Sequence, residues 1–564
     1  MRLNLLLDCL TWLLVGFPLL TGGIWGKIDG KFLELSELAV PTFIWSLLAL
    51  GLYKWKGVSF RNTLTFRYFK TSFARIERFY EQSPKSAEIL YVLILGGLLS
   101  WASLRRHWAF ESHGYDLAIF DNAIWNLVHG NGYLSSVRGY SNLFVDHQSP
   151  LFFALAPFYA LMPRAETLLV LQAFGIASSG VAIAWLAQKV LIDQPPKIAR
   201  QIALLGALSF FLYAPIRSAA LFDFHPETFM LPVFLFSLVG LLSKNTSEKL
   251  IGLCLFFVAL LAKESAGAVG AGIGLSLILR KDTRKWGWVC CLAGFAVFLI
   301  DLKLVPGWLG ARYTYTHEFP LFGGDLKRLI LSPILEPQLF WSQIVQKHRL
   351  KFLFFTLAPL GFIPLFAPAA LTSALPGYLM LFLSTGGTRL NLGFHYAVEP
   401  AVGLFFAWPF GIKRLLNSSV PYRKWVMIIL FFAIAFSGRS IAYSIRRYTP
   451  DTHSQWLRYE LLPLIDRSIP LAATDSLLPH LSGRQWLAQV LSPMKESPRL
   501  QCVIIDTALA PWPSGSHARA IEGVPSDLAL EYHCNTVSVF GKDCFHSVRR
   551  PSCTDNNSGA RSSL

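Results

Sequence analysis

AEILYVLILGGLLSWAS, residues 87–103, is an apolar run that contains one charged side chain, Glu88. A helix needs about 20 mainly apolar residues to cross the hydrocarbon core of a bilayer, and this run approaches that length. The whole chain has the same character, because 53% of its 564 residues are hydrophobic, only 15% are charged, and the mean hydropathy is +0.44. A soluble domain carries about 25% charged residues. The sequence therefore predicts an all-α polytopic membrane protein.

The basic residues indicate how the chain is oriented. Residues 53–85 are strongly basic and follow two apolar runs at 4–22 and 37–53. Because short cytoplasmic loops carry an excess of Lys and Arg, we expect a cytoplasmic N-terminus and an outward crossing at 87–103. Segment 104–148 then forms the first outer loop. The same rule accounts for the net charge of +17, so we do not expect nucleic acid as a partner.

Further apolar runs predict about 12 or 13 spans in total. Lys263 and Glu264 interrupt one long run, which we interpret as two short spans that meet there. Repeated prolines should divide the helices of 352–384. The runs after the outer loop are 150–163, 166–191, 201–221, 228–243, 250–279, 287–304, 352–384, 400–412 and 425–442.

The last part of the chain, residues 446–564, is more polar and predicts a small extracytoplasmic α/β domain with a disordered tail. IPLAATDSLLPHLSGRQW followed by RLQCVIIDTALA indicates strand, helix, strand. Four of the eight cysteines lie here, Cys502, Cys534, Cys544 and Cys553. An oxidising compartment would allow disulfides among them, but their pairing stays open. We thus divide the chain into 1–86, a membrane domain 87–445, and 446–564.

GYDLAIFDNAIWNLVHG, residues 114–130, places two carboxylates among apolar residues of the first outer loop. A helix through 116–129 would be amphipathic, with one apolar and one polar stripe, and would suit the membrane surface. Asp116 precedes the first periodic residue and is a candidate N-cap. Asp121 falls inside the apolar stripe, where an unpaired carboxylate is costly, so we expect it to face a cation, a metal or a polar cavity.

Charged and histidine side chains recur at the predicted outer ends of other spans. Each has a structural alternative: a wet loop for FDFHPE, and mutual neutralisation for Lys263 and Glu264. Their shared placement predicts a polar pocket at the outer membrane face. The candidate binding residues are Arg105, Arg106, His147, Asp223, His225, Glu227, Lys263, Glu264, Arg389, His395 and Tyr396.

Six motifs, in order, resemble a bacterial membrane family catalogued as domain of unknown function 2079. The resemblance covers roughly residues 87–510 and lies in YDLAIFDNAIWNLVHGNGYLSS, DHQSPLFFALAPFYAL, LLVLQAF, FDFHPETFMLPVF, AKESAG and SLLPHLSGR. That family in turn is similar to the GT-C class of glycosyltransferases, which includes protein O-mannosyltransferases and lipid A aminoarabinose transferases.

The resemblance implies a GT-C-like fold and transfer of a sugar from a polyprenyl-phosphate donor at the outer face of a bacterial inner membrane. The acceptor would be an envelope glycan, lipid or protein. An acidic residue in the first outer loop serves as general base in that class, which maps first to Asp116 and second to Asp121. An inverting transfer would need cations for the leaving phosphate, such as Lys263, Arg389, Arg105 or Arg106.

The sequence departs from familiar transferases in its acidic residues. It lacks a tight Asp-x-Asp and an adjacent Asp-Glu pair in the outer loop, and Asp116 and Asp121 would lie about 140° apart on a helix. A divalent metal cofactor therefore stays open, with no metal-specific spacing to support it. Two other functions stay open as well: a transporter or lipid flippase lined by Lys263 and Glu264, and a non-catalytic membrane scaffold.

Overall fold

The computed structural model describes residues 27–28, 31–32, 64–139, 142–311, 314–418, 421–438, 441–490, 499–509, 516–547 and 550–553. The predicted spans 4–22 and 37–53 and most of the predicted disordered tail lie outside the described residues. The described residues group into two compact units. Unit 1 takes those within Met1–Ala102, Gln172–Phe222 and Pro226–Arg447, and unit 2 those within Ser103–Leu171, Asp223–His225 and Tyr448–Leu564.

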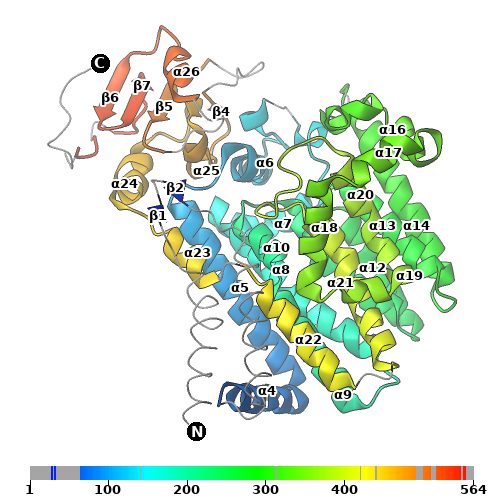
Figure 1. The fold of residues 1–564 in the computed structure, drawn as a ribbon. Coiled ribbons are helices and arrows are strands. Elements are labelled where there is room, and N and C mark those ends of the chain that lie inside the picture. The colour runs from blue at the N-terminus through cyan, green and yellow to red at the C-terminus, as the bar shows by residue number, and fades with distance from the viewer. Residues whose placement is uncertain are drawn as a thin grey trace. The chain divides into compact units, whose positions relative to one another are not determined.

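Unit 1 is built mainly from helices (Figure 1). The end of α5 and the start of α8 belong to unit 2. The helices of this part are α4 (Leu64–Gln82), α5 (Pro84–Trp108), α8 (Ala165–Val190), α9 (Pro196–Leu212), α10 (Ala214–Leu221), α11 (Met230–Leu241), α12 (Thr246–Leu260), α13 (Glu264–Ile278), α14 (Arg284–Leu299), α15 (Val305–Trp308), α16 (Leu326–Leu335), α17 (Pro337–Ile344), α18 (Lys347–Leu357), α19 (Pro368–Leu371), α20 (Leu375–Leu383), α21 (Val398–Leu416), α22 (Tyr422–Ala435) and α23 (Ile441–Arg447), with a short hairpin of β1 (Lys27–Ile28) and β2 (Lys31–Phe32).

Among the described residues, three helices are long and apolar enough to cross a membrane: α5, α8 and the continuous stretch Arg284–Trp308. The pair α9 and α10 would make a fourth span, bent by 51°. Pro215 explains this bend, because proline has no N–H to donate to the carbonyl of Phe211. The Arg217 side chain donates to that carbonyl instead, at 3.0 Å.

Several other predicted spans occur as shorter apolar helices, so the count of about 12 or 13 stays a prediction. The predicted break near Lys263 is confirmed, since α12 ends at Leu260 and α13 begins at Glu264. The predicted division of 352–384 is also confirmed. There α18 ends at Leu357, and prolines begin the short helices that follow it.

Small residues let α13 and α14 pack with their backbones in close approach (Figure 1). A Cβ atom added at Gly267 would lie 2.6 Å from the backbone nitrogen of Phe298, and one at Gly287 would lie 2.5 Å from that of Ile278. In a bilayer, where apolar burial contributes little between helices, such close contact is a main source of helix association.

Unit 2 combines Ser103–Leu171, which contains the predicted outer loop, with Asp223–His225 and the C-terminal region. Its helices are α6 (Ile119–Val128), α7 (Leu151–Leu161), α24 (Thr452–Trp456), α25 (Leu478–Leu481) and α26 (Ser516–Glu522), and its strands are β3 (Leu471–Ala473), β4 (Leu487–Gln489), β5 (Cys502–Asp506), β6 (Leu530–Cys534) and β7 (Val537–Gly541).

The strands form one sheet in the order β4-β3-β5-β7-β6 (Figure 1). β3 pairs in parallel with β4 and β5, so Ala472 faces Ala488 on one side and Val503 on the other. β7 runs antiparallel to β5 and β6. The predicted strand, helix, strand order of the C-terminal α/β domain is therefore confirmed.

Two disulfides close this region, Cys502–Cys544 and Cys534–Cys553. They resolve the pairing that the sequence left open. The first joins β5 to the segment after β7, across 42 residues, and the second spans 19 residues.

Replacing Cys502 by Ser should destabilise the C-terminal region, because the chain-entropy cost of closing a loop of this length is about 4 kcal/mol. We expect trypsin to release C-terminal fragments of the Cys502→Ser protein at lower urea concentrations than for the wild type. Cys254→Ser is the matched control, since Cys254 is a free, exposed thiol. Equal resistance of both variants would contradict a stabilising role for the bridge.

Candidate functional site

Asp116 lies in a single π-helical turn, Gly114–Ala118, directly before α6. The residue before this turn is His113, in extended conformation, and its side chain makes no capping hydrogen bond. The N-cap of α6 is Ala118. The predicted N-cap role of Asp116 is therefore wrong, and a π-helical turn, a feature frequent at functional sites, replaces the expected first helical turn.

The Asp116 carboxylate is paired with His225. Its Oδ1 lies 3.2 Å from Nε2 of His225, and the Asp116 side chain is 29% exposed while that of His225 is 5% exposed. Nδ1 of His225 lies 3.0 Å from the carbonyl oxygen of Asp223. Because a carbonyl oxygen only accepts, Nδ1 carries a hydrogen. The contact between Nε2 and the Asp116 carboxylate then requires a proton shared by these two groups.

A buried ion pair holds the start of the π-helical turn. Asp223 is fully buried; its Oδ1 accepts from Nη1 of Arg106 at 2.8 Å, and its Oδ2 accepts from the backbone N–H of His113 at 2.9 Å. Charge-assisted hydrogen bonds of this kind are about twice as strong as neutral ones. The predicted binding residues Arg106, Asp223 and His225 are thus brought together with Asp116 inside unit 2.

A second carboxylate, that of Asp475, binds the same turn. Its Oδ2 lies 2.9 Å from Nδ1 of His113 and its Oδ1 accepts from the backbone N–H of Gly114 at 3.0 Å. A Cβ atom at position 114 would lie 2.4 Å from Cδ1 of Leu478 and 2.9 Å from Oδ1 of Asp475, so a larger residue would force these side chains to shift. Burial opposes a charged His113, but the hydrogen bond to Asp475 and the charge of Asp223 raise the pKa of its imidazole.

Asp121 is only 1% exposed. Its Oδ1 accepts from the Tyr159 hydroxyl at 2.8 Å and its Oδ2 from the Ser482 hydroxyl at 2.6 Å. The sequence predicted a cation, a metal or a polar cavity as partner, whereas the partners found are two hydroxyl groups. Burial raises the pKa of Asp121 to about 7. This carboxyl is therefore a buried structural group, and Asp116 is the more accessible of the two candidate bases.

The polar face of α6 is buried, in contrast to the predicted helix on a membrane surface. Asn122 and Asn126 are both fully buried. Nδ2 of Asn122 donates to the carbonyl oxygens of Ser482 and Arg484, at 3.2 and 2.7 Å. Amide groups that satisfy backbone carbonyls in this way connect the outer loop to the C-terminal region within unit 2.

Unit 1 contains its own cluster of predicted site residues. Oε1 of Glu227 lies 3.0 Å from Nζ of Lys263 and 3.0 Å from Nε2 of His395. Glu227 and His395 are almost fully buried, and Glu264 next to Lys263 is also buried. The sequence suggested mutual neutralisation of Lys263 and Glu264, whereas the ion pair in the structure joins Lys263 to Glu227. A metal ion at this Glu227 oxygen would have to displace the lysine ammonium.

The remaining candidates make separate contacts. Arg389 pairs with Glu318 at 2.9 Å and its guanidinium lies 5.6 Å from the ring centre of Tyr396. His147 lies 3.7 Å from the Asp146 carboxylate, and Arg105 donates to the hydroxyl of Thr449.

Sequence reasoning missed several partners of these residues. His113, Asp475, Tyr159, Ser482 and Glu318 were not chosen, although Ser482 lies in the quoted motif SLLPHLSGR. Asp475 and His113 are separated by 362 positions, and no periodicity in one chain links residues so far apart. The position of Asp475 directly before that motif was a local signal that could have pointed to it.

The raised pKa of Asp121 predicts a specific pH dependence of stability. A buried carboxyl favours its protonated form, so its contribution is complete below the unfolded value near 4 and is lost as the pH rises through about 7. Asp121→Asn should remove this loss in thermal unfolding of detergent-solubilised protein between about pH 4 and pH 7. Glu111→Gln, at an exposed carboxylate, should keep the wild-type slope; a wild-type slope in Asp121→Asn would contradict the assignment.

Removing Lys263 should destabilise unit 1 strongly. Lys263→Met leaves Glu227 buried with one partner fewer, and breaking a buried ion pair costs about 3–5 kcal/mol. The double variant Lys263→Met with Glu227→Gln should regain most of this loss, which can be measured as the thermal midpoint of the solubilised protein. No recovery in the double variant would show that the pair is not the source of the effect.

Comparisons with known proteins place the chain in a family. The family model described as predicted membrane protein, DUF2079, matches residues 106–536. A search of curated proteins finds no match. The chain is similar to crystal structures of ArnT from Cupriavidus metallidurans: with undecaprenyl phosphate bound, the TM-score is 0.45 at 13% identity, covering 81% of this chain and 98% of that chain.

The apo structure of the same ArnT has a TM-score of 0.42, with 13% identity and the same coverage of both chains. Scores this low do not transfer a function. The family model, in contrast, spans well over half of the sequence. The protein therefore belongs to the DUF2079 family of predicted membrane proteins.

Proposed function

We propose that the protein is a GT-C-like membrane glycosyltransferase that moves a sugar from a polyprenyl-phosphate donor to a glycan, lipid or protein acceptor of the envelope. The observation that carries this proposal is the pair of Asp116 and His225. It combines a partly exposed carboxylate with a buried imidazole at 3.2 Å. A base must reach the proton that it abstracts, and Asp116 meets this condition better than the buried Asp121.

The proposed step is a single displacement with inversion. Asp116 takes the proton of an acceptor hydroxyl while that oxygen forms a bond to the anomeric carbon of the sugar. The bond from the anomeric carbon to the phosphate oxygen breaks, and its electron pair leaves with polyprenyl phosphate. His225 acts as a positioning residue, because its Nε2 contact at 3.2 Å holds the Asp116 carboxylate in place.

Preorganisation of the turn supports this role. Asp223 and Asp475 bind the backbone N–H groups of His113 and Gly114, at the start of the turn that carries Asp116. A base held by fixed hydrogen bonds needs little reorganisation during the reaction.

The leaving phosphate needs a cation. Arg106, Lys263 and Arg389 each already face a carboxylate, so a phosphate would have to share their charge with that partner. Arg105, which donates to Thr449, is the further candidate. A divalent metal would supply the same charge stabilisation for the leaving phosphate.

We further propose that the protein lies in a bacterial inner membrane with a cytoplasmic N-terminus and its C-terminal region outside. The basic stretch 53–85 favours the cytoplasm. The disulfides Cys502–Cys544 and Cys534–Cys553 favour an oxidising compartment for the other end of the chain.

Asp116→Asn should reduce sugar transfer by about 10²–10⁴-fold, the usual contribution of a general base. The measurement is transfer from polyprenyl-phosphate sugars extracted from the producing cells, with expression and membrane insertion checked on gels. Glu111→Gln is the matched control, because it removes another carboxylate of the same segment and should leave transfer unchanged. Normal transfer by Asp116→Asn would exclude Asp116 as the base.

A further inference from the structure

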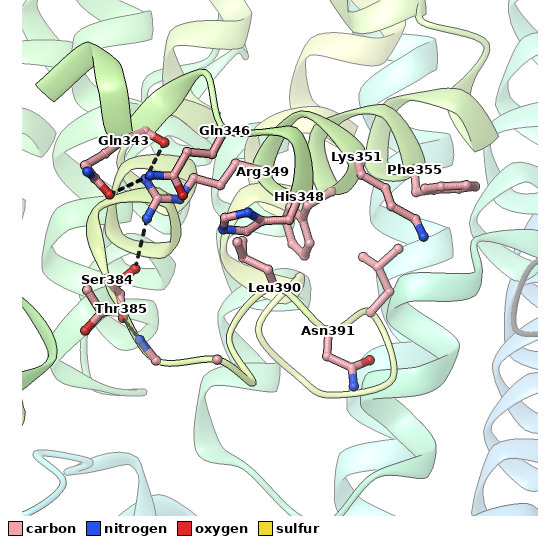
Figure 2. A pocket seen from close by; sticks show the side chains of 14 residues that line it. Gln343, Gln346, His348, Arg349, Lys351, Phe355, Ser384, Thr385, Leu390 and Asn391 are labelled. Carbon is pink, nitrogen blue, oxygen red and sulfur yellow. Dashed lines mark hydrogen bonds between the residues drawn. The ribbon is translucent and has the colours of Figure 1, made fainter.

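Unit 1 contains a pocket of about 720 Å³ at the N-terminal half of α18. This volume lies in the usual range for small-molecule sites. The loop that follows α20 forms the opposite wall, and Figure 2 shows Arg349 between Gln343 and Ser384. The lining residues include three basic side chains and no acidic one: Gln343, Gln346, His348, Arg349, Lys351, Phe352, Phe355, Ser384, Thr385, Gly386, Gly387, Leu390, Asn391 and Leu392.

Arg349 is a buried cation in the wall of this pocket, with 3% of its surface exposed. Its guanidinium donates to the carbonyl oxygen of Gln343 and, at 3.4 Å, to that of Ser384. Among the described residues, Nε has no hydrogen-bond partner and no carboxylate forms an ion pair with this side chain. A buried charge without a counterion is costly, which favours an anion as the missing partner.

The position of these cations on α18 also favours a bound anion. His348 and Arg349, which line the pocket, lie in the first turn of α18, and that turn has no acidic residue and no side-chain cap. The N-terminus of a helix carries a partial positive charge, so cations there are unfavourable by themselves. A bound anion would interact with both the helix end and the side chains.

We propose that this pocket binds the phosphate group of an anionic ligand through Arg349 and Lys351. Arginine binds phosphate through paired N–H groups, and Lys351, whose Nζ lies 5.9 Å from the ring centre of Phe355, adds a second positive charge. Phe352, Phe355 and Leu390 offer apolar contacts beside it, which suit the phosphate headgroup of a lipid. Binding here does not require sugar transfer at Asp116.

Binding to the full-length, detergent-purified protein is the direct test, with undecaprenyl phosphate and inorganic phosphate as separate probes in native mass spectrometry. Lys351→Gln should weaken binding about tenfold, equal to the loss of one charge-assisted hydrogen bond. Lys347→Gln is the matched control, since Lys347 lies on the same helix, one turn before Lys351, but does not line the pocket. Its affinity should stay within about twofold of the wild type.

The outcomes separate the sources of the phosphate. Binding of undecaprenyl phosphate alone, lost in Lys351→Gln, assigns a lipid headgroup, whereas equal loss for both probes assigns the phosphate group itself. Wild-type protein that binds neither probe, or Lys351→Gln that binds as Lys347→Gln does, would overturn the proposal. Arg349→Gln is a second variant for the same readout. If this buried substitution prevents folding, the Lys351→Gln variant still tests the proposal.

Discussion

The buried carboxylate of Asp223 is the interaction on which the candidate site depends. It neutralises Arg106, accepts the backbone N–H of His113, and precedes by two residues the histidine that contacts Asp116. A fully buried carboxylate is tolerated only with such partners. The short segment 223–225 belongs to the same compact unit as residues 103–171 and the C-terminal region. Its Asp223 holds the start of the turn that carries Asp116 through the backbone N–H of His113.

Charges in this protein have two kinds of environment. Some buried charges are matched by charged partners, as Glu227 is by Lys263 and His395, which is how ionisable groups persist beside apolar helices. Arg349, like Arg217 and Arg484, has backbone carbonyl oxygens as acceptors. Arg349 also lines the pocket beside α18, where a ligand could neutralise its charge. Asp116 is paired with His225, but its side chain is also partly exposed.

Local signals in the sequence predicted much of the helical fold. Charges at 263–264 and prolines in 352–384 correctly marked helix ends, because both act on the backbone nearby. The disulfide pairing and the burial of Asn122 were not predictable in this way. The same holds for the contacts of His113 with Asp475 and of Asp121 with Ser482. These depend on residues hundreds of positions apart, which no helical period relates.

The fate of the donor lipid tests the proposed transfer most directly. Purified protein in proteoliposomes would receive polyprenyl-phosphate sugar labelled in the sugar, with a solubilised envelope extract as acceptor, and chromatography would separate donor from products. A transferase that uses Asp116 as base predicts that label leaves the lipid in step with release of polyprenyl phosphate. Intact labelled lipid that only crosses the bilayer would contradict transfer and would indicate a flippase.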